Sequence, residues 1–140
     1  MSGTAVQSRK MCFVEVEDEA KALFEEAFAE HDVSFAGWLD DVPEDTEIVS
    51  VFITKQIDSS FLDDHPLIRL IATRSTGCDH IDLDVSERRG VGVANVGNYE
   101  VVLTPHVAFN SHEAMERLTG ITVENINAYL KGRAVGHTSV

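Results

Sequence analysis

The sequence contains few basic residues. Of its 140 residues, 24 are Asp or Glu and only 11 are Lys or Arg, which gives a formal net charge of −13. Nucleic-acid binding needs a basic face that displaces counterions from phosphates, so this deficit argues against a nucleic-acid partner. A surface rich in carboxylates repels itself at low salt and is tolerated where salt screens it. We therefore favour a halophilic source over an ordinary acidic cytosolic protein.

Long apolar runs and cysteines are also scarce. No apolar run approaches the ~20 residues that a membrane-spanning helix needs, and no signal-peptide pattern opens the chain. The two cysteines, Cys12 and Cys78, are too few for a disulfide framework and have no zinc-type spacing. We expect them to be buried, reduced thiols. These absences predict a soluble, cytoplasmic protein with no membrane partner.

The remaining composition is that of a globular protein, with 44% hydrophobic and 7% aromatic residues. A chain of this length forms one domain around one core. Residues 1–10 are small and polar and are expected to form a flexible leader, and residues 11–140 the single domain.

Short β-prone runs alternate with helical patterns along the first two thirds of the chain. The β-prone runs span residues 11–16, 33–38, 48–53, 67–73 and 92–96, and helical patterns span 17–28, 59–64 and 81–89. The first helix is expected to present one apolar face, formed by Ala20, Leu23, Phe24, Ala27 and Phe28. This alternation predicts an α/β fold with a five-stranded parallel sheet and right-handed crossovers.

The alternation breaks after the fifth run. A turn over 97–100 leads almost directly into a further β-prone run at 101–103, and a long helix is expected from Ser111 to Lys131. That helix carries an almost continuous apolar stripe, and Gly132 stands where a C-terminal cap belongs. The apolar stripe predicts that this helix packs back on the domain.

Two segments resemble ligand-binding motifs. Gly90-Val-Gly92 lacks the third glycine of a dinucleotide fingerprint and precedes a strand, so we interpret it as a turn. The loop 74–80 follows a buried strand, where open α/β sheets bind ligands, and Ser75, Thr76 and Gly77 are small enough for an anion-binding backbone nest. From these residues alone, an ordinary βα turn is an equal alternative.

Histidines offer two further candidates. Asp79, His80 and Asp82 could be metal ligands, but we favour a helix cap, because aspartate before a helix accepts from backbone donors. His106 follows Pro105 at the end of a β-prone run, a place that suits a proton donor or acceptor, although most such histidines are surface or capping residues. No GxSxG elbow or HExxH motif accompanies it.

Three segments together resemble the D-isomer-specific 2-hydroxyacid dehydrogenases. They are Leu70-Ile-Ala-Thr-Arg-Ser-Thr-Gly-Cys-Asp-His-Ile-Asp82, Arg89-Gly-Val-Gly-Val-Ala-Asn-Val96 with Tyr99, and Leu103-Thr-Pro-His-Val-Ala-Phe109. The resemblance implies a flavodoxin-like substrate domain. It also implies that the NAD-binding Rossmann domain, which such enzymes insert into this domain, is absent between about Tyr99 and Val101. The domain then consists of residues 11–100 and a return segment, 101–140.

The resemblance also implies site residues. Ser75, Thr76 and Gly77 correspond to the backbone site for the substrate carboxylate, Tyr99 to an aromatic residue at the cleft, and Phe109 to one that touches the substrate side chain. His106 corresponds to the general acid/base that protonates the carbonyl oxygen. The family's catalytic arginine and glutamate, and its cofactor site, belong to the missing part.

The resulting hypothesis is a substrate domain whose parent enzyme reduces 2-oxo acids to D-2-hydroxy acids with NAD or NADP. The chain itself then holds no cofactor, is inactive, and can self-associate through the surface where the lost hinge helices packed. An alternative is a stand-alone flavodoxin-like module that binds a small carboxylate as a sensor or regulator. A receiver-like phosphoacceptor domain fits less well, because Thr54 and Lys55 follow the third strand where an aspartate belongs.

Overall fold

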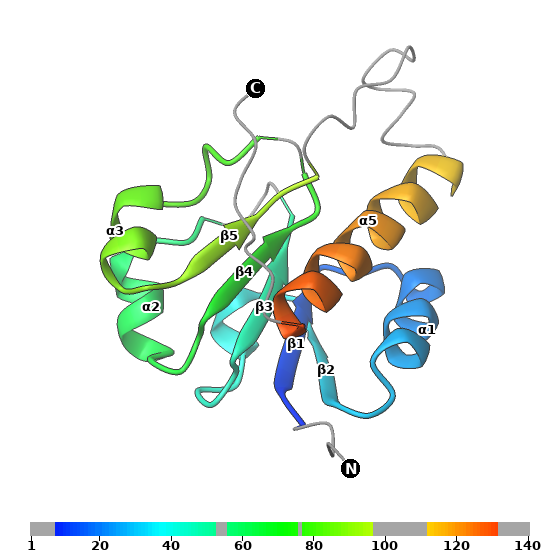
Figure 1. The fold of residues 1–140 in the computed structure, drawn as a ribbon, viewed down its shortest axis with the longest axis horizontal. Coiled ribbons are helices and arrows are strands. Elements are labelled where there is room, and N and C mark those ends of the chain that lie inside the picture. The colour runs from blue at the N-terminus through cyan, green and yellow to red at the C-terminus, as the bar shows by residue number, and fades with distance from the viewer. Residues whose placement is uncertain (1–7, 53–55, 76, 97–111, 132–140) are drawn as a thin grey trace.

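The fold consists of one parallel β-sheet between two layers of helices, as seen in a computed structural model of the chain (Figure 1). The structure describes residues 8–52, 56–75, 77–96 and 112–131. The five strands lie in the order β2-β1-β3-β4-β5, and every neighbouring pair is parallel. Their bounds are Lys10–Val14 (β1), Asp32–Ala36 (β2), Ile48–Val51 (β3), Leu70–Thr73 (β4) and Gly92–Ala94 (β5).

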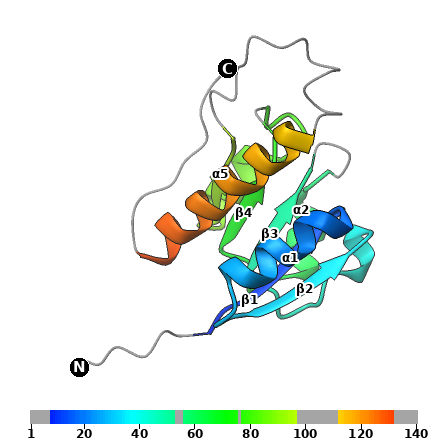
Figure 2. The same ribbon diagram turned by 90° about the vertical axis from the view of Figure 1, so that its right-hand side faces the viewer.

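Helices cover both faces of the sheet. Their bounds are Asp18–Ala27 (α1), Ser59–Asp64 (α2), Leu83–Arg88 (α3) and His112–Leu130 (α5), with a short 3-10 turn, Leu39–Asp41 (η1), after β2. Helices α1 and α5 lie side by side on one face, and α2 and α3 lie on the other (Figures 1 and 2). The predicted α/β fold with a flanked parallel sheet and a returning C-terminal helix is confirmed.

The core has two parts, one on each face of the sheet. Under α1 and α5, the ring of Phe13 stacks on that of Phe24, with 4.1 Å between centroids. Under α2 and α3, aliphatic residues of β3 and β4 pack against Ile57, Phe61 and Leu62. All four residues of β4 are buried, as expected for a strand that is covered on both faces.

The first helix buries a narrower face than its sequence predicts. Ala20, Phe24 and Phe28 are buried, but Leu23 and Ala27 are exposed. Because α1 covers the edge of the sheet beside α5, only one row of residues spaced four apart faces the core. The expected five-residue apolar face of α1 is therefore wrong at two positions.

The C-terminal helix closes the domain on the same face as α1. Leu118, Thr122 and Ile126 are buried, and the Asn125 side chain donates to the backbone oxygen of Asn95 at 2.9 Å. The expected β-prone run at 101–103 and the capping Gly132 lie outside the described residues. Within the described part of the chain, no helix combines the length and apolarity needed to cross a bilayer.

The strand order creates a topological switch point. After β1 the chain moves to one side of the sheet to form β2, and from β3 onward it moves to the other side. Crossover connections therefore diverge between β1 and β3, and open α/β sheets bind their ligands outside the carboxyl ends of the strands at such a point.

Candidate functional site

The loop 74–80 leaves β4 at the carboxyl edge of the sheet. The backbone N–H of Arg74 donates to Val51 at the end of β3 (2.8 Å), and the oxygen of Ser75 accepts from Val96 (2.9 Å). The oxygen of His80 accepts from Ile57 at 2.8 Å. These bonds tie the loop to the ends of β3 and β5 and to the segment before α2, so its start and its finish are both fixed.

Arg74 places a buried guanidinium at the switch point. Its side chain is only 4% exposed and donates to the backbone oxygens of Val14 and Glu15 and to the Ser50 hydroxyl, the last at 2.8 Å. Burial lowers the pKa of Arg74 to about 10, and the nearby charge of Glu15 acts in the opposite direction. Arg74 therefore remains protonated at neutral pH, and a chain of net charge −13 keeps one cation inside this edge.

Glu15 has a strained backbone where it meets Arg74. Its φ is 58°, in the left-handed region that costs a non-glycine residue of order 1 kcal/mol or more. Its N–H donates to the oxygen of Ala36 at 2.9 Å, and its own oxygen accepts from Arg74 at 3.0 Å. The two bonds hold the conformation, so the turn after β1 and the loop after β4 form one unit.

A chain of hydroxyl groups lies beneath the same loop. Ser75 is buried, and its Oγ donates to the oxygen of Gly77 at 2.9 Å. Thr73 Oγ1 lies 2.6 Å from Ser75 Oγ and 2.9 Å from His80 Nε2. Burial lowers the pKa of His80, while Asp79 opposes this shift. Gly77 itself is exposed.

The structure thus brings two of the predicted carboxylate-binding residues, Ser75 and Gly77, to the carboxyl edge. The side chain of Ser75 is turned into the protein, and its hydroxyl is occupied by the oxygen of Gly77. Thr76, Tyr99, His106 and Phe109 lie outside the described residues, and their roles stay predictions.

The capping interpretation of the Asp79–Asp82 segment is confirmed. Asp82 Oδ1 accepts from the backbone N–H of Val85 at 3.1 Å at the start of α3. No group of three or more His, Cys, Asp or Glu that could hold a metal ion occurs among the residues that the structure describes.

The turn interpretation of Gly90-Val-Gly92 is also confirmed. Gly90 has φ 73° and donates to the oxygen of Glu87 at 3.1 Å, and Gly92 opens β5. The glycines therefore lie at the amino edge of the sheet, opposite the edge where nucleotides bind, and they lead into a strand rather than a helix. This segment is therefore not a dinucleotide fingerprint.

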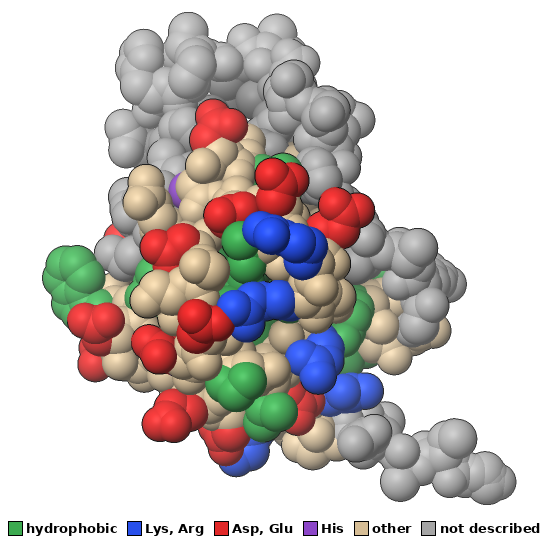
Figure 3. All heavy atoms as spheres, turned by 90° about the vertical axis from the view of Figure 1, so that its left-hand side faces the viewer, with side chains coloured by type: hydrophobic (Ala, Val, Ile, Leu, Met, Phe, Trp, Pro, Cys, Tyr) green, Lys and Arg blue, Asp and Glu red, His purple; other side chains and the backbone are tan. Residues whose placement is uncertain are grey.

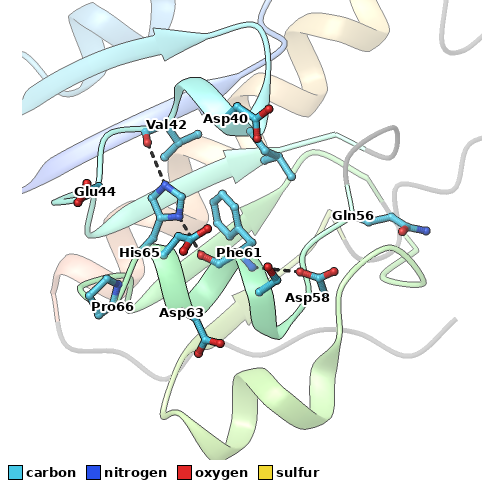
Figure 4. A pocket seen from close by; sticks show the side chains of 12 residues that line it. Asp40, Val42, Glu44, Gln56, Asp58, Phe61, Asp63, His65 and Pro66 are labelled. Carbon is cyan, nitrogen blue, oxygen red and sulfur yellow. Dashed lines mark hydrogen bonds between the residues drawn. The ribbon is translucent and has the colours of Figure 1, made fainter.

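A second concave region lies beside α2 (Figure 4). It has a volume of about 710 Å³ and lies between the η1 segment and α2. Within it, the two ring nitrogens of His65 lie 2.8 Å from the oxygen of Phe61 and 2.9 Å from that of Val42. Five carboxylates line it: Asp40, Glu44, Asp58, Asp63 and Asp64. Such a lining repels an anionic acid, and none of the described residues of the loop 74–80 contributes to it.

Sequence reasoning missed Arg74, Thr73 and His80 as parts of one assembly. One signal was available for Arg74, which is a basic residue directly after a mostly apolar strand in a chain with few basic residues. The thiols differ from each other. Cys12 is buried as expected, whereas Cys78 is only partly buried because it belongs to the loop at the surface. Both are free, and burial raises the pKa of each thiol.

Comparisons with known proteins identify the family to which this chain is similar. Residues 11–139 match the profile of the D-isomer specific 2-hydroxyacid dehydrogenase catalytic domain. A D-lactate dehydrogenase from Aquifex aeolicus, solved with NAD and lactic acid, is 29% identical, with a TM-score of 0.61 over 74% of this chain and 32% of that one. An NAD-dependent formate dehydrogenase from Staphylococcus aureus, solved with NAD, is 21% identical, with a TM-score of 0.54 over 89% of this chain and 41% of that one.

A third structure agrees in fold. The apo D-lactate dehydrogenase of Escherichia coli is 20% identical, with a TM-score of 0.55 over 65% of this chain and 32% of that one. No curated protein matches the sequence. The chain aligns with about a third of the length of the two lactate dehydrogenases. Because the family profile covers nearly the whole chain, the chain belongs to the D-isomer specific 2-hydroxyacid dehydrogenase family and corresponds to its catalytic domain.

Proposed function

We propose that the chain is the substrate domain of an NAD(P)-dependent D-2-hydroxyacid dehydrogenase and that the inserted NAD-binding domain is absent between residues 100 and 101. The family match over 11–139 carries the proposal, because it runs through this point with no room for a second domain. The ligand is a small 2-oxo or D-2-hydroxy acid. Its carboxylate binds the backbone N–H groups of Ser75, Thr76 and Gly77.

The structural support for this assignment is the local charge at the carboxyl edge. Arg74 provides a buried positive charge at the switch point, and the loop is tied to three neighbouring segments. Preorganised N–H donors bind an anion without a large ordering cost. In the same proposal His106 is the general acid/base, while Tyr99 and Phe109 contact the rest of the substrate.

Catalysis by this chain alone is not expected. In this proposal NAD or NADP supplies the hydride in the complete enzyme, and the domain that would bind it is absent from this chain. Purified chain should bind pyruvate in a calorimetric titration, should bind pyruvamide far more weakly because it lacks the carboxylate, and should not oxidise NADH or NADPH. Equal binding of the two compounds would contradict the carboxylate site, and turnover by contaminant-free protein would contradict the predicted inactivity.

A second candidate is a natural stand-alone module that binds a small carboxylate as a sensor or regulator. The observation in its favour is that α5 completes the layer beside α1, so the sheet is covered without a further domain. The gene's reading frame separates the two candidates. A Rossmann-coding segment between the codons for Glu100 and Val101 supports an engineered deletion, and its absence supports the module.

The acidic surface leads to a related proposal, a halophilic source. On the face that carries α2 and α3, acidic side chains surround a smaller group of basic ones (Figure 3). The free energy of unfolding should then rise between low and molar potassium chloride, and a fall would contradict the halophilic source.

The two free thiols suit a reducing compartment, so we propose a cytoplasmic location. Self-association is testable by sedimentation, where a monomer at all concentrations would exclude it.

A further inference from the structure

The hydrogen-bond chain under the loop has only one consistent direction. The oxygen of Gly77 can only accept, so the Ser75 hydroxyl donates its single hydrogen there, over 2.9 Å. Ser75 Oγ must then accept from the Thr73 hydroxyl at 2.6 Å. Thr73 has no second hydrogen, so it must accept from His80 Nε2 at 2.9 Å. The chain therefore begins at an Nε2–H donor on His80 and ends at the Gly77 carbonyl.

This direction fixes the peptide that joins Gly77 to Cys78. In a trans peptide the carbonyl oxygen and the following N–H point in opposite directions, and no cis peptide bond occurs among the described residues. The Gly77 oxygen is drawn toward buried Ser75. The N–H of Cys78 is consequently turned away from Ser75, toward the exposed side of the loop, where an anion can reach it.

We propose that His80 is a positioning residue that acts through Thr73 and Ser75 to turn the N–H of Cys78 toward the ligand carboxylate. The ligand in this inference rests on the proposed function, whereas the orientation rests on the hydrogen-bond geometry alone. Cys78 thereby supplies a backbone donor next to Gly77, and its thiol is not needed.

The charge state of His80 is compatible with this role. The charged group beside the ring is Asp79, and the backbone oxygen of His80 is held separately by Ile57 at 2.8 Å. Burial favours the neutral ring, and both the Nε2–H tautomer and the doubly protonated ring keep the required donor. The chain of bonds should thus persist across the neutral range.

The test compares His80→Leu with His80→Gln, because the glutamine amide retains a donor near the Nε2 position. In protein saturated with pyruvate, His80→Leu should speed hydrogen exchange of the Cys78 amide, because its bond to the carboxylate is weakened, and it should also weaken pyruvate binding, each about five- to tenfold, as expected for one lost hydrogen bond. His80→Gln should restore both to within about twofold. His31→Leu is the control, since His31 bonds the N–H of Arg9 at 3.0 Å at the opposite edge of the sheet. It should change neither.

Nitrogen shifts of the His80 ring give a readout that needs no variant. The Nε2–H tautomer is expected, and an Nδ1–H tautomer would overturn the inference. Unchanged exchange in pyruvate-saturated His80→Leu, or no restoration in His80→Gln, would also overturn it. If His80→Leu does not fold, Thr73→Val breaks the next link. The expected tautomer without pyruvate binding by the wild type would refute the proposed function while leaving the hydrogen-bond chain from His80 supported.

Discussion

The loop after β4 and the groove beside α2 are both polar and both contain a hydrogen-bonded histidine, but they differ in charge. At the loop, one buried guanidinium and a chain of hydroxyls are paired with backbone oxygens and with His80. The groove is lined by five carboxylates, and His65 bridges two backbone oxygens. The chain is acidic overall, yet it has a buried cation, Arg74, at the carboxyl edge of the sheet. The groove lined by carboxylates lies on a different surface, beside α2.

The difference teaches where an anionic substrate can bind. Size alone favours the groove, whose volume is about 710 Å³. Electrostatics favours the loop, because carboxylates that face a shared hollow raise the cost of bringing in another anion. We therefore propose that the ligand binds at the loop and that His65 has only a structural role.

The largest expected effect comes from removing the cation at the loop. Arg74→Leu should lower the free energy of unfolding by about 3 kcal/mol, because buried acceptors on Val14, Glu15 and Ser50 lose their donor. Urea denaturation measures the change. Arg88→Leu, at an exposed position, is the control and should change stability by less than about 0.5 kcal/mol. Equal losses for both would remove the special role of Arg74.

His65→Phe should have the next largest effect, and on stability alone. The phenyl ring can take the place of the imidazole, whose centroid lies 4.2 Å from that of the Phe61 ring. Both contacts of the imidazole to backbone oxygens are lost, however. We expect a loss of about 2 kcal/mol in urea denaturation, with unchanged pyruvate affinity. Weaker pyruvate binding would mean that the groove and the loop are not independent.

A smaller effect concerns pH at the loop. Because burial lowers the pKa of His80 below 6.5, the unfolded chain takes up the proton more readily than the folded one. Stability contributed by the neutral ring is therefore lost as the pH falls below about 6.5. His80→Gln should lose less stability than the wild type between about pH 7.5 and 5, by no more than about 1 kcal/mol. Identical pH profiles from thermal unfolding would contradict this prediction.

The smallest effect on stability is expected at Gly77. A Cβ there would meet no described atom within 4 Å, and the backbone is not left-handed. Gly77→Ala should therefore change stability by less than about 0.5 kcal/mol, while its methyl group crowds the exposed side of the loop and weakens pyruvate binding several-fold. Gly120→Ala is the matched control, because Gly120 also has open space around it and lies on α5. Unaltered affinity in Gly77→Ala would argue against a ligand at this loop.

Much of the fold could be predicted because its strands have a clear physical signature. The run that contains β4 is nearly all apolar, as expected for burial on both faces, and Asp58 and Asp82 cap the two short helices as aspartates before helices do. Strand ends were less predictable. The second strand runs from Asp32 to Ala36 rather than from Val33 to Trp38, because pairing with β1 determines where it starts and stops.

The loop that carries the candidate site could be located from the sequence, but its contacts could not. Its position follows from a nearly apolar strand that is followed, after Arg74, by the small residues Ser75 to Gly77. The partners of Arg74 could not be foreseen, since Ser50 and Val14 lie 24 and 60 residues away along the chain. The link from His80 to Thr73 spans only 7 residues, but it depends on the turn of a loop that no periodicity describes.

An amide-resolved NMR titration of the 140-residue chain with pyruvate tests the central claim most directly. If the loop after β4 is the carboxylate site, the amide signals of Gly77 and Cys78 should shift in a saturable way, and those of residues 58–65 beside the groove should stay in place. Saturable shifts confined to residues 58–65, or no shifts at all, would contradict the account.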